Sequence, residues 1–276
     1  MDNGQLKVSP LAINFSAALR NTLIFNFQFE KGCLFMSGHS KWKNIMHKKE
    51  KTDAQRGKIF TKIGREITMA VKEGGSDPVA NNKLKEVIAK AKSNNVPNDN
   101  IDRIIKKAAV SADSTNYDNI TYEGYGPCGV AIIIETLTDN RNRTAGDLRH
   151  YFDKHGGNLG QAGSVSWLFA KKGIVVIEKE GKNEDKLMED AINAGAADFN
   201  FDEEVFEIFT DSTELAQVRD FLEKEGYSFL SAQEEMIPSN YIKVEKEEDL
   251  KNLEKLLEIL EDNDDVQNVW HNWLDN

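Results

Sequence analysis

The chain has 276 residues, of which 39% are apolar and 29% charged, with a formal net charge of -11. This length is sufficient for two or three domains with hydrophobic cores of their own, and the composition is that of a water-soluble protein. Two cysteines, Cys33 and Cys128, stand far apart and outside any C-x-x-C pair. This spacing argues against a disulfide framework or a structural zinc site, and it favours a reducing, cytoplasmic setting.

Charge is divided unevenly along the chain. Residues 36–110 hold 17 Lys and Arg against 8 Asp and Glu, whereas residues 111–276 hold 15 against 36. The protein therefore has a basic head and an acidic body. A local basic patch governs contact with polyanions, so we expect the head to face nucleic acid and the body to be repelled by it.

Residues 1–35 differ in character from the rest of the chain. The apolar stretch at 11–29 is interrupted by polar residues such as Asn14 and Arg20, so it is too broken to span a bilayer. It also lacks the basic start of a secretory signal. A purine-rich sequence resembling a bacterial ribosome-binding site can encode Glu30-Lys31-Gly32, shortly before Met36. We expect residues 1–35 to be a start-site artefact. The alternative is a transit peptide, which would place the protein in an organelle.

The head is predicted to be helical. A helix is expected over 52–73, with Asp53 as its cap and Gly74-Gly75 at its end. Apolar residues occupy one side at helical spacing. The opposite side carries a narrow basic stripe of Lys51, Lys58, Lys62, Arg65 and Lys72. Further helices are predicted over 78–94, with Pro78 in the first turn, and from Pro97 onward.

After a polar linker at 113–119, strands and helices alternate. An almost continuously apolar strand is predicted at 129–139, followed by a helix capped by Thr144 that ends at Gly156-Gly157. Two strands are expected around a Lys171-Lys172 turn. Strand residues are expected within 201–209, and 227–237 leads into another strand. The remaining predicted strands are at 241–244 and 266–271, and the remaining helices at 184–194, 212–225 and 247–261. This alternation predicts an α+β protein in which an all-α domain precedes ferredoxin-like split β-α-β modules.

No catalytic or metal-binding motif is evident. None of the five histidines lies in an H-E-x-x-H motif, and no G-x-S-x-G elbow occurs. The glycine-rich run at 156–163 lacks the GK[ST] of a phosphate-binding loop. We interpret it as a helix cap and a tight entry into the next strand, with a binding loop as the weaker alternative. The sequence therefore predicts a protein that is not an enzyme and needs no metal or cofactor.

Basic residues are the one chemical signal, because Lys and Arg neutralise phosphates without reading sequence. Trp42 can stack on an unpaired base, or it can pin the N-terminal arm to the helices. The basic stripe can also be a solvated helix face. Arg141 and Arg143 lie beside an expected helix N-terminus, a second place for phosphate contact. The candidate nucleic-acid-binding residues are Lys41, Trp42, Lys43, His47, Lys48, Lys49, Lys51, Arg56, Lys58, Lys62, Arg65, Arg141 and Arg143.

Four stretches carry a resemblance to a known family: "SGHSKWKNIMHKKEKTDAQRGKIF", "VPNDNIDRIIKKA", "YEGYGPCGVAIIIETLTDNRNRT" and "GGNLGQAGSVSWLF". From Met36 to its C-terminus, the chain resembles the YebC/PmpR family, which includes the mitochondrial translational activator of cytochrome c oxidase subunit I. The resemblance implies a basic helical domain at 36–114 and two α/β modules, one inserted in the other. The outer module would comprise 115–164 and 241–276, and the insert 165–240.

The resemblance also implies a role in gene expression. The family is commonly labelled as DNA-binding transcriptional regulators, while its mitochondrial members act in translation and bacterial members have been linked to ribosomes stalled at proline-rich stretches. The sequence shows no helix-turn-helix and no RRM or KH signature. We predict a DNA-binding transcriptional regulator, with a translation factor that binds rRNA or tRNA on the ribosome as the alternative. A protein-binding adaptor is a third possibility. No membrane partner is expected, and a monomer is favoured.

Overall fold

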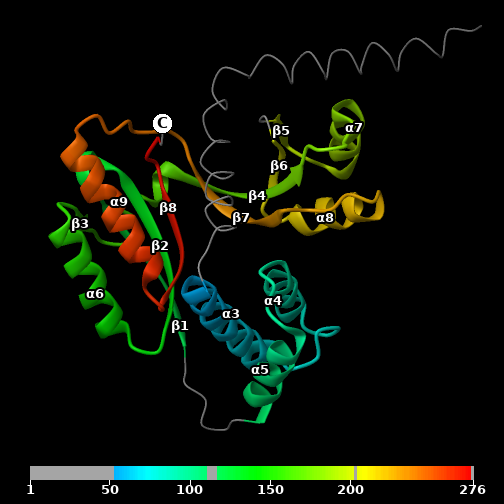
Figure 1. The fold of residues 1–276 in the computed structure, drawn as a ribbon, viewed down its shortest axis with the longest axis horizontal. Coiled ribbons are helices and arrows are strands. Elements are labelled where there is room, and N and C mark those ends of the chain that lie inside the picture. Colours follow the sequence, from blue (N-terminus) through cyan, green and yellow to red (C-terminus); the bar gives the residue numbers. More distant parts are fainter. Residues whose placement is uncertain (1–52, 111–116, 202–203, 275–276) are drawn as a thin grey trace, which may run out of the picture.

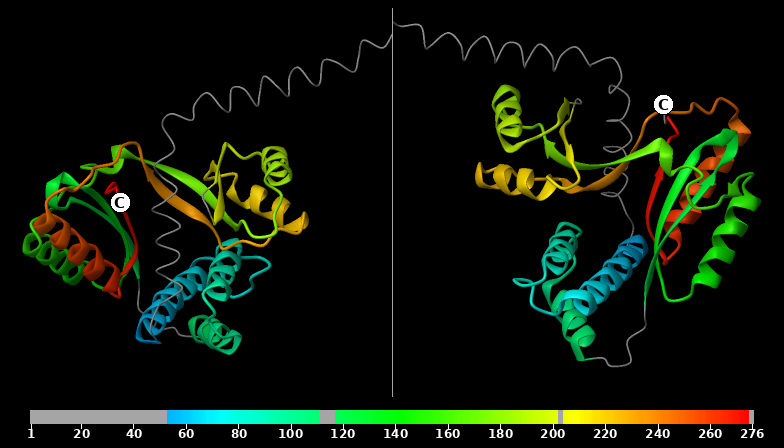
Figure 2. Two further views of the ribbon diagram at one scale, coloured as in Figure 1. Left: turned by 45° about the horizontal axis from the view of Figure 1, so that its top comes forward. Right: turned by 180° about the vertical axis from the view of Figure 1, so that it is seen from behind.

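The computed structural model of the protein describes residues 53–110, 117–201 and 204–274. It has three parts, which Figure 1 shows at the bottom, left and upper right, and Figure 2 shows from two further sides. The head contains α3 (Asp53–Gly74), α4 (Asn82–Ser93) and α5 (Asn98–Val110). The middle module contains β1 (Asp118–Tyr125), η1 (Pro127–Gly129), β2 (Ala131–Thr138), α6 (Arg141–Lys154), β3 (Asn158–Leu159), α9 (Glu247–Asp262) and β8 (Val266–His271). The inserted module, which lies between β3 and α9 in sequence, contains η2 (Ser166–Leu168), β4 (Phe169–Glu178), α7 (Glu184–Ala194), β5 (Asp198–Phe201), β6 (Val205–Asp211), α8 (Leu215–Lys224) and β7 (Ser231–Pro238).

The head is held together by the apolar side of α3. Ile63, Ile67 and Ala70 recur at helical spacing and are almost fully buried. They pack in one core with Leu84 of α4 and Ile101 of α5, among other residues. Because this side of α3 faces its own domain, the opposite side is left for contacts outside the head.

The ends of the head helices follow local rules. Helix α3 ends at Gly74, and Gly75 has a φ of +85°, a conformation that glycine adopts without strain. The predicted end of this helix is therefore confirmed. The predicted start of the next helix at Pro78 is wrong: α4 begins at Asn82, because the side chain of Asn81 caps it by accepting a hydrogen bond from the Leu84 amide.

The middle module is an antiparallel sheet with strand order β3-β1-β2-β8. Helices α6 and α9 cover one face, where Ile132 and Ile134 of β2 pack with Phe152 and Leu256. The alternate residues of β2, such as Ile133, are buried on the other face against residues that include Trp270 and Met236. Burial on both faces explains why β2 is an almost continuous apolar run.

The inserted module repeats this plan with strand order β5-β6-β4-β7. Its helices α7 and α8 pack against one face of the sheet, where Val175, Phe206 and Leu222 are fully buried. In both sheets, two parallel strands joined through a helix flank an antiparallel strand, which is the split β-α-β arrangement. The predicted fold class is confirmed, while the predicted domain limits stay predictions.

Several local predictions in the two modules were wrong. Strand β1 covers most of the segment between the expected linker and the expected first strand. Helix α6 is capped by Asn140 rather than Thr144, and it begins three residues before Thr144. Residues 166–168 form a 3-10 turn and β4 runs unbroken through Lys171 and Lys172. In place of a strand at 241–244 there is a single bridge, from Ile242 to Trp273.

Among the helices of the described ranges, none combines the length and the apolar character needed to cross a bilayer.

Gly157 provides a test of the packing between α6 and β1. A Cβ atom there would lie 2.6 Å from the Tyr125 carbonyl oxygen and 3.2 Å from the Gly126 Cα atom. Backbone cannot rotate away as a side chain can, so we expect Gly157→Ala to lower the free energy of unfolding by about 1–3 kcal/mol. Thermal unfolding followed by circular dichroism measures this loss.

The matched control is Gly146→Ala, on the exposed side of α6, where an added Cβ meets nothing within 4 Å. Alanine is the better helix former by about 1 kcal/mol, so this variant should be at least as stable as the wild type. Equal stability of the Gly157→Ala and Gly146→Ala variants would contradict the packing described for Gly157.

Candidate nucleic-acid interface

The structure separates the predicted binding residues into two groups. Seven of them lie outside the described residues: Lys41, Trp42, Lys43, His47, Lys48, Lys49 and Lys51. Four others, Arg56, Lys58, Lys62 and Arg65, lie on α3, and Arg141 and Arg143 lie in the first turn of α6. The described part of the prediction thus falls on two helices from different domains.

Lys58, Lys62 and Arg65, which we call the cationic row, contact the middle module. Their partners belong to residues 261–265, the end of α9 and the turn into β8, which we call the acidic corner. The Lys58 ammonium lies 2.5 Å from an Asp262 carboxylate oxygen. Lys62 donates to the Glu261 carbonyl at 2.6 Å, and Arg65 donates to the Asp264 carbonyl at 2.8 Å. The row therefore joins the head to the middle module.

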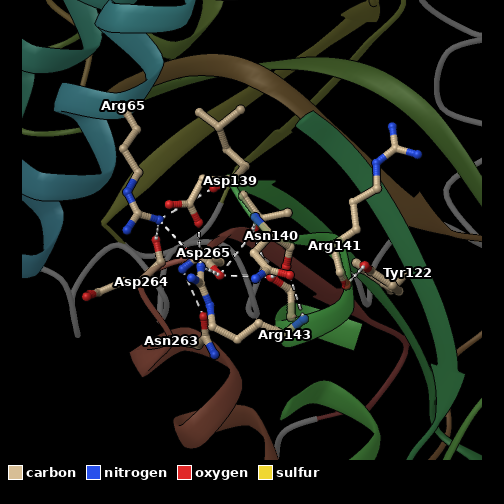
Figure 3. Close-up of polar contacts among 12 residues, drawn as sticks. Arg65, Tyr122, Asp139, Asn140, Arg141, Arg143, Asn263, Asp264 and Asp265 are labelled. Atoms are coloured by element: carbon tan, nitrogen blue, oxygen red, sulfur yellow. Dashed lines mark hydrogen bonds and ion pairs between the residues drawn. The ribbon is translucent and has the colours of Figure 1, made fainter. Parts of the chain in front are cut away.

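Asp265 is the centre of this contact (Figure 3). Its Oδ1 accepts a hydrogen bond from Arg65 at 2.7 Å. Its Oδ2 accepts from Arg143 at 2.6 Å, from Thr144 at 2.8 Å and from Thr138 at 3.1 Å. One carboxylate thus binds groups from α3, the end of β2 and the start of α6.

The charge of Asp265 is stabilised although the residue is only 4% exposed. Burial alone would raise the pKa of this carboxyl group, but the hydrogen bonds from Arg143, Thr144 and Arg65 outweigh that effect and hold the pKa below its ordinary value. The same contact raises the pKa of Arg143, which also pairs with Asp139 at 2.8 Å. Asp265 is therefore ionised at neutral pH.

The pairs in this interface differ in exposure. The side chains of Lys58 and Asp262 are 41% and 57% exposed, so solvent screens their attraction. Those of Arg65 and Asp265 are 20% and 6% exposed, so their attraction is screened much less. An open cavity of ≈ 390 Å³ lies between these groups, lined by Lys58, Arg65, Asp139, Arg143, Asp147, Asp262, Asn263, Asp264 and Asp265.

Arg141, the other predicted phosphate contact on α6, pairs with Asp118 at 2.8 Å on the surface. The helix N-terminus beside it is partly occupied, because the Asn140 side chain accepts a hydrogen bond from the Arg143 amide at 3.1 Å. In this arrangement, protein carboxylates contact both arginines that the sequence suggested for phosphate.

The glycine-rich run is organised by a buried glutamate. Glu123 accepts hydrogen bonds from the amides of Gly163, Val165 and Ser166 at 2.7–2.9 Å. Burial would raise the pKa of Glu123, but these amides together lower it. Since a carboxylate of the protein itself occupies them, these three amides are not open to a phosphate. Gly156, with a φ of +75°, directly follows the cap residue of α6, which confirms the interpretation as a helix cap.

Two residues that the sequence interpretation missed stand out. Asp265 was assigned no role from the sequence; the available signal was its position directly before the predicted strand at 266–271. Trp167 is 71% exposed, and its indole nitrogen is tied to the Ser164 carbonyl at 3.0 Å. The Tyr125 hydroxyl donates to the same carbonyl at 2.9 Å. The loop that Glu123 organises therefore holds an exposed indole in a fixed position.

Across residues 53–110, 117–201 and 204–274, no group of three or more His, Cys, Asp or Glu side chains is arranged to hold a metal ion.

Asp265 predicts how stability depends on pH. Its folded-state pKa lies below the ordinary value of 3.8, so the unfolded chain takes up this proton first as the pH falls. Its contribution is complete above that value and is lost as the pH falls through the folded-state pKa. Asp265→Asn should lower the free energy of unfolding at pH 7 by about 1–3 kcal/mol, because charge-assisted hydrogen bonds are lost.

Urea unfolding at pH 7 and at roughly pH 3 tests this, since the wild type should lose more stability between the two than Asp265→Asn does. The neighbouring Asp264→Asn is the control, because the side chain there is exposed and Arg65 contacts only the backbone carbonyl. If Asp264→Asn lost as much stability as Asp265→Asn, the central role of Asp265 would be refuted.

Comparison with known families matches nearly all of the described chain. Residues 40–111 match the family model described as TACO1/YebC protein N-terminal domain. Residues 117–273 match the model described as TACO1/YebC second and third domain. Residues 1–35 lie outside both matches, and their origin as a start-site artefact stays a prediction.

Individual relatives agree with this. A probable transcriptional regulatory protein of Acetivibrio thermocellus is 59% identical over 239 residues, covering 86% of this chain and 99% of that protein. One of Caldicellulosiruptor bescii is 57% identical over 239 residues, covering 86% and 98%. The crystal structure of a conserved hypothetical protein from Aquifex aeolicus superposes with a TM-score of 0.73 at 44% identity, covering 81% of this chain and 92% of that one. The chain therefore belongs to the TACO1/YebC family.

Proposed function

We propose that the protein is a non-enzymatic regulator of gene expression that binds nucleic acid through its head. The observation that carries this proposal is a set of exposed cations on the other two helices of the head, α4 and α5. They are Lys85 and Lys92, seven residues apart on α4, and Arg103, Lys106 and Lys107 on one side of α5. Lysine and arginine arranged in this way bind a phosphate backbone without reading its sequence.

The division of charge supports the same orientation. Residues 36–110 carry 17 basic against 8 acidic residues, while residues 111–276 carry 15 against 36. A polyanion is attracted to the first part and repelled by the second. The predicted contacts of the N-terminal arm, Trp42 among them, would extend the same basic surface.

We take DNA-binding transcriptional regulation as the first form of this function. The names of the bacterial relatives, probable transcriptional regulatory protein, support it. The cytoplasmic location, the monomeric state and the lack of a cofactor remain predictions from the sequence.

Action on the ribosome is the second form, and the exposed indole of Trp167 favours it. A tryptophan held in a fixed position can stack on an unpaired base, and unpaired bases are common in folded RNA. The cations of α4 and α5 suit contact with an RNA backbone equally well.

Charge reversal on α5 tests the proposed function. Lys106→Glu with Lys107→Glu should weaken binding of a labelled DNA duplex, and of a structured RNA, at least about tenfold at low salt, because two phosphate contacts are lost. The slope of log affinity against log salt should become shallower by about 2 units. Fluorescence anisotropy over a salt series measures both quantities.

The control is Lys186→Glu with Lys224→Glu, the same change of charge at exposed positions of the inserted module. This variant should bind almost as the wild type does. Equal weakening in the two variants would show that net charge, rather than the head, governs binding, and the proposal would fail.

The two forms of the function predict different distributions in a cell extract. A transcriptional regulator should stay at the top of a sucrose gradient and should prefer one promoter over scrambled DNA by about a hundredfold, or about 2.7 kcal/mol. A translation factor should sediment with ribosomal particles, and Trp167→Ala should weaken that association. Sedimentation with ribosomes and no promoter preference would exclude the transcriptional form.

A further inference from the structure

The contact between the head and the middle module is polar in character. The buried residues of the head form one core and those of the middle module another, and no hydrophobic cluster of the described residues includes both. Its ion pairs and short hydrogen bonds join the cationic row to the carboxylates and carbonyls of the acidic corner, and Arg65 also lies over the Tyr117 ring, 5.7 Å from the ring centroid. Since no hydrophobic cluster of the described residues crosses this interface, ions and water can compete for its charged groups.

The acidic corner presents to the cationic row the same kind of groups as a nucleic acid backbone, namely anionic and hydrogen-bond-accepting oxygens. The row occupies positions i, i+4 and i+7 of α3 and therefore spans about 10 Å along the helix. Over this span the corner presents the carboxylates of Asp262 and Asp265, together with main-chain carbonyls. Like a phosphate backbone, this is a short row of anionic and strongly accepting oxygens.

The last turn of α9 is unusual for a helix end. The C-terminus of a helix carries partial negative charge, which favours basic residues there. The last turn of α9 has no basic residue and ends in Glu261-Asp262. The compensating cations come from the head, since Lys58 and Lys62 both bond to this turn. The negative charge of the acidic corner is thus balanced only when cations from another part of the chain cover it.

We propose that the acidic corner is an internal competitor for nucleic acid, so that the head presents its cationic row to a polyanion only after it leaves the corner. This inference rests on the proposed function. The closed arrangement and the nucleic-acid complex use the same three side chains, which makes them mutually exclusive at the row. The exposed cations of α4 and α5 make the first encounter, and release of the row then adds further phosphate contacts.

Zero-length carbodiimide coupling of the wild-type chain tests the exclusion directly. Lys58 and Asp262 are in contact, so coupling should join them in the free protein, and mass spectrometry of the digest detects the linked peptides. Saturating DNA duplex or structured RNA without terminal phosphates should lower the yield of this link at least about fivefold. The Lys172–Asp211 and Lys83–Glu73 pairs, within the inserted module and the head, serve as internal controls whose yields should not change.

Removing negative charge from the acidic corner is the converse test, because it weakens the proposed competitor. Asp262→Asn with Asp264→Asn leaves Asp265 intact and should raise affinity for the same duplex or RNA about three- to tenfold. Glu248→Gln with Glu254→Gln changes the net charge equally at exposed positions earlier on α9 and should have little effect. If the gain came only from weaker overall repulsion between the protein and the nucleic acid, both variants would gain affinity equally, and the corner would not be a specific competitor.

The outcomes distinguish this inference from the function on which it rests. If nucleic acid binds and reversal of Lys106 and Lys107 weakens it, but the Lys58–Asp262 link persists at saturation, the internal competitor is refuted while the proposed function stands. Equal affinities of the corner variant and the wild type would refute it in the same way. If neither DNA nor RNA binds the head, the proposed function fails and this inference fails with it.

Discussion

The arrangement of the head on the middle module depends on one buried carboxylate. Asp265 binds Arg65 of the head and, within its own module, Arg143, Thr144 and Thr138. A buried charge is stable only when hydrogen-bond donors surround it, and here α3, β2 and α6 supply them. Because the donors inside the middle module remain when the head is removed, Asp265 can hold its place in both arrangements.

Electrostatics then gives the two sides of α3 different roles. Its apolar side is buried and holds the head together, whereas the contacts of its cationic row are mainly ion pairs and hydrogen bonds, which are weaker and reversible. The outer pair, between Lys58 and Asp262, is half exposed, while the inner pair, between Arg65 and Asp265, is shielded. Polyanions and salt therefore act first at the outer pair, and the inner pair sets how firmly the head is held.

Local rules predicted much of the fold. The predicted bounds of α7 and β8 match the structure, because periodicity, caps and glycines all act within a few residues. Strand β1 was not predicted because two of its residues are untypical of a strand. Glu123 is there to bind the loop amides, and Gly124 leaves room for Phe152. In the candidate site, helical spacing placed the cationic row on the side of α3 away from the core. It did not predict what covers the row, because the partner, Asp265, is 200 residues away from Arg65.

The most direct test of the account is the distance between the head and the middle module. Spin labels at Val79→Cys on the head and Glu254→Cys on α9, with Cys33 and Cys128 replaced by serine, report this distance by pulsed electron paramagnetic resonance. The account predicts one narrow distance distribution in the free protein and a second, separate distribution when nucleic acid saturates the head. One unchanged distribution in both states, with nucleic acid bound, would contradict it.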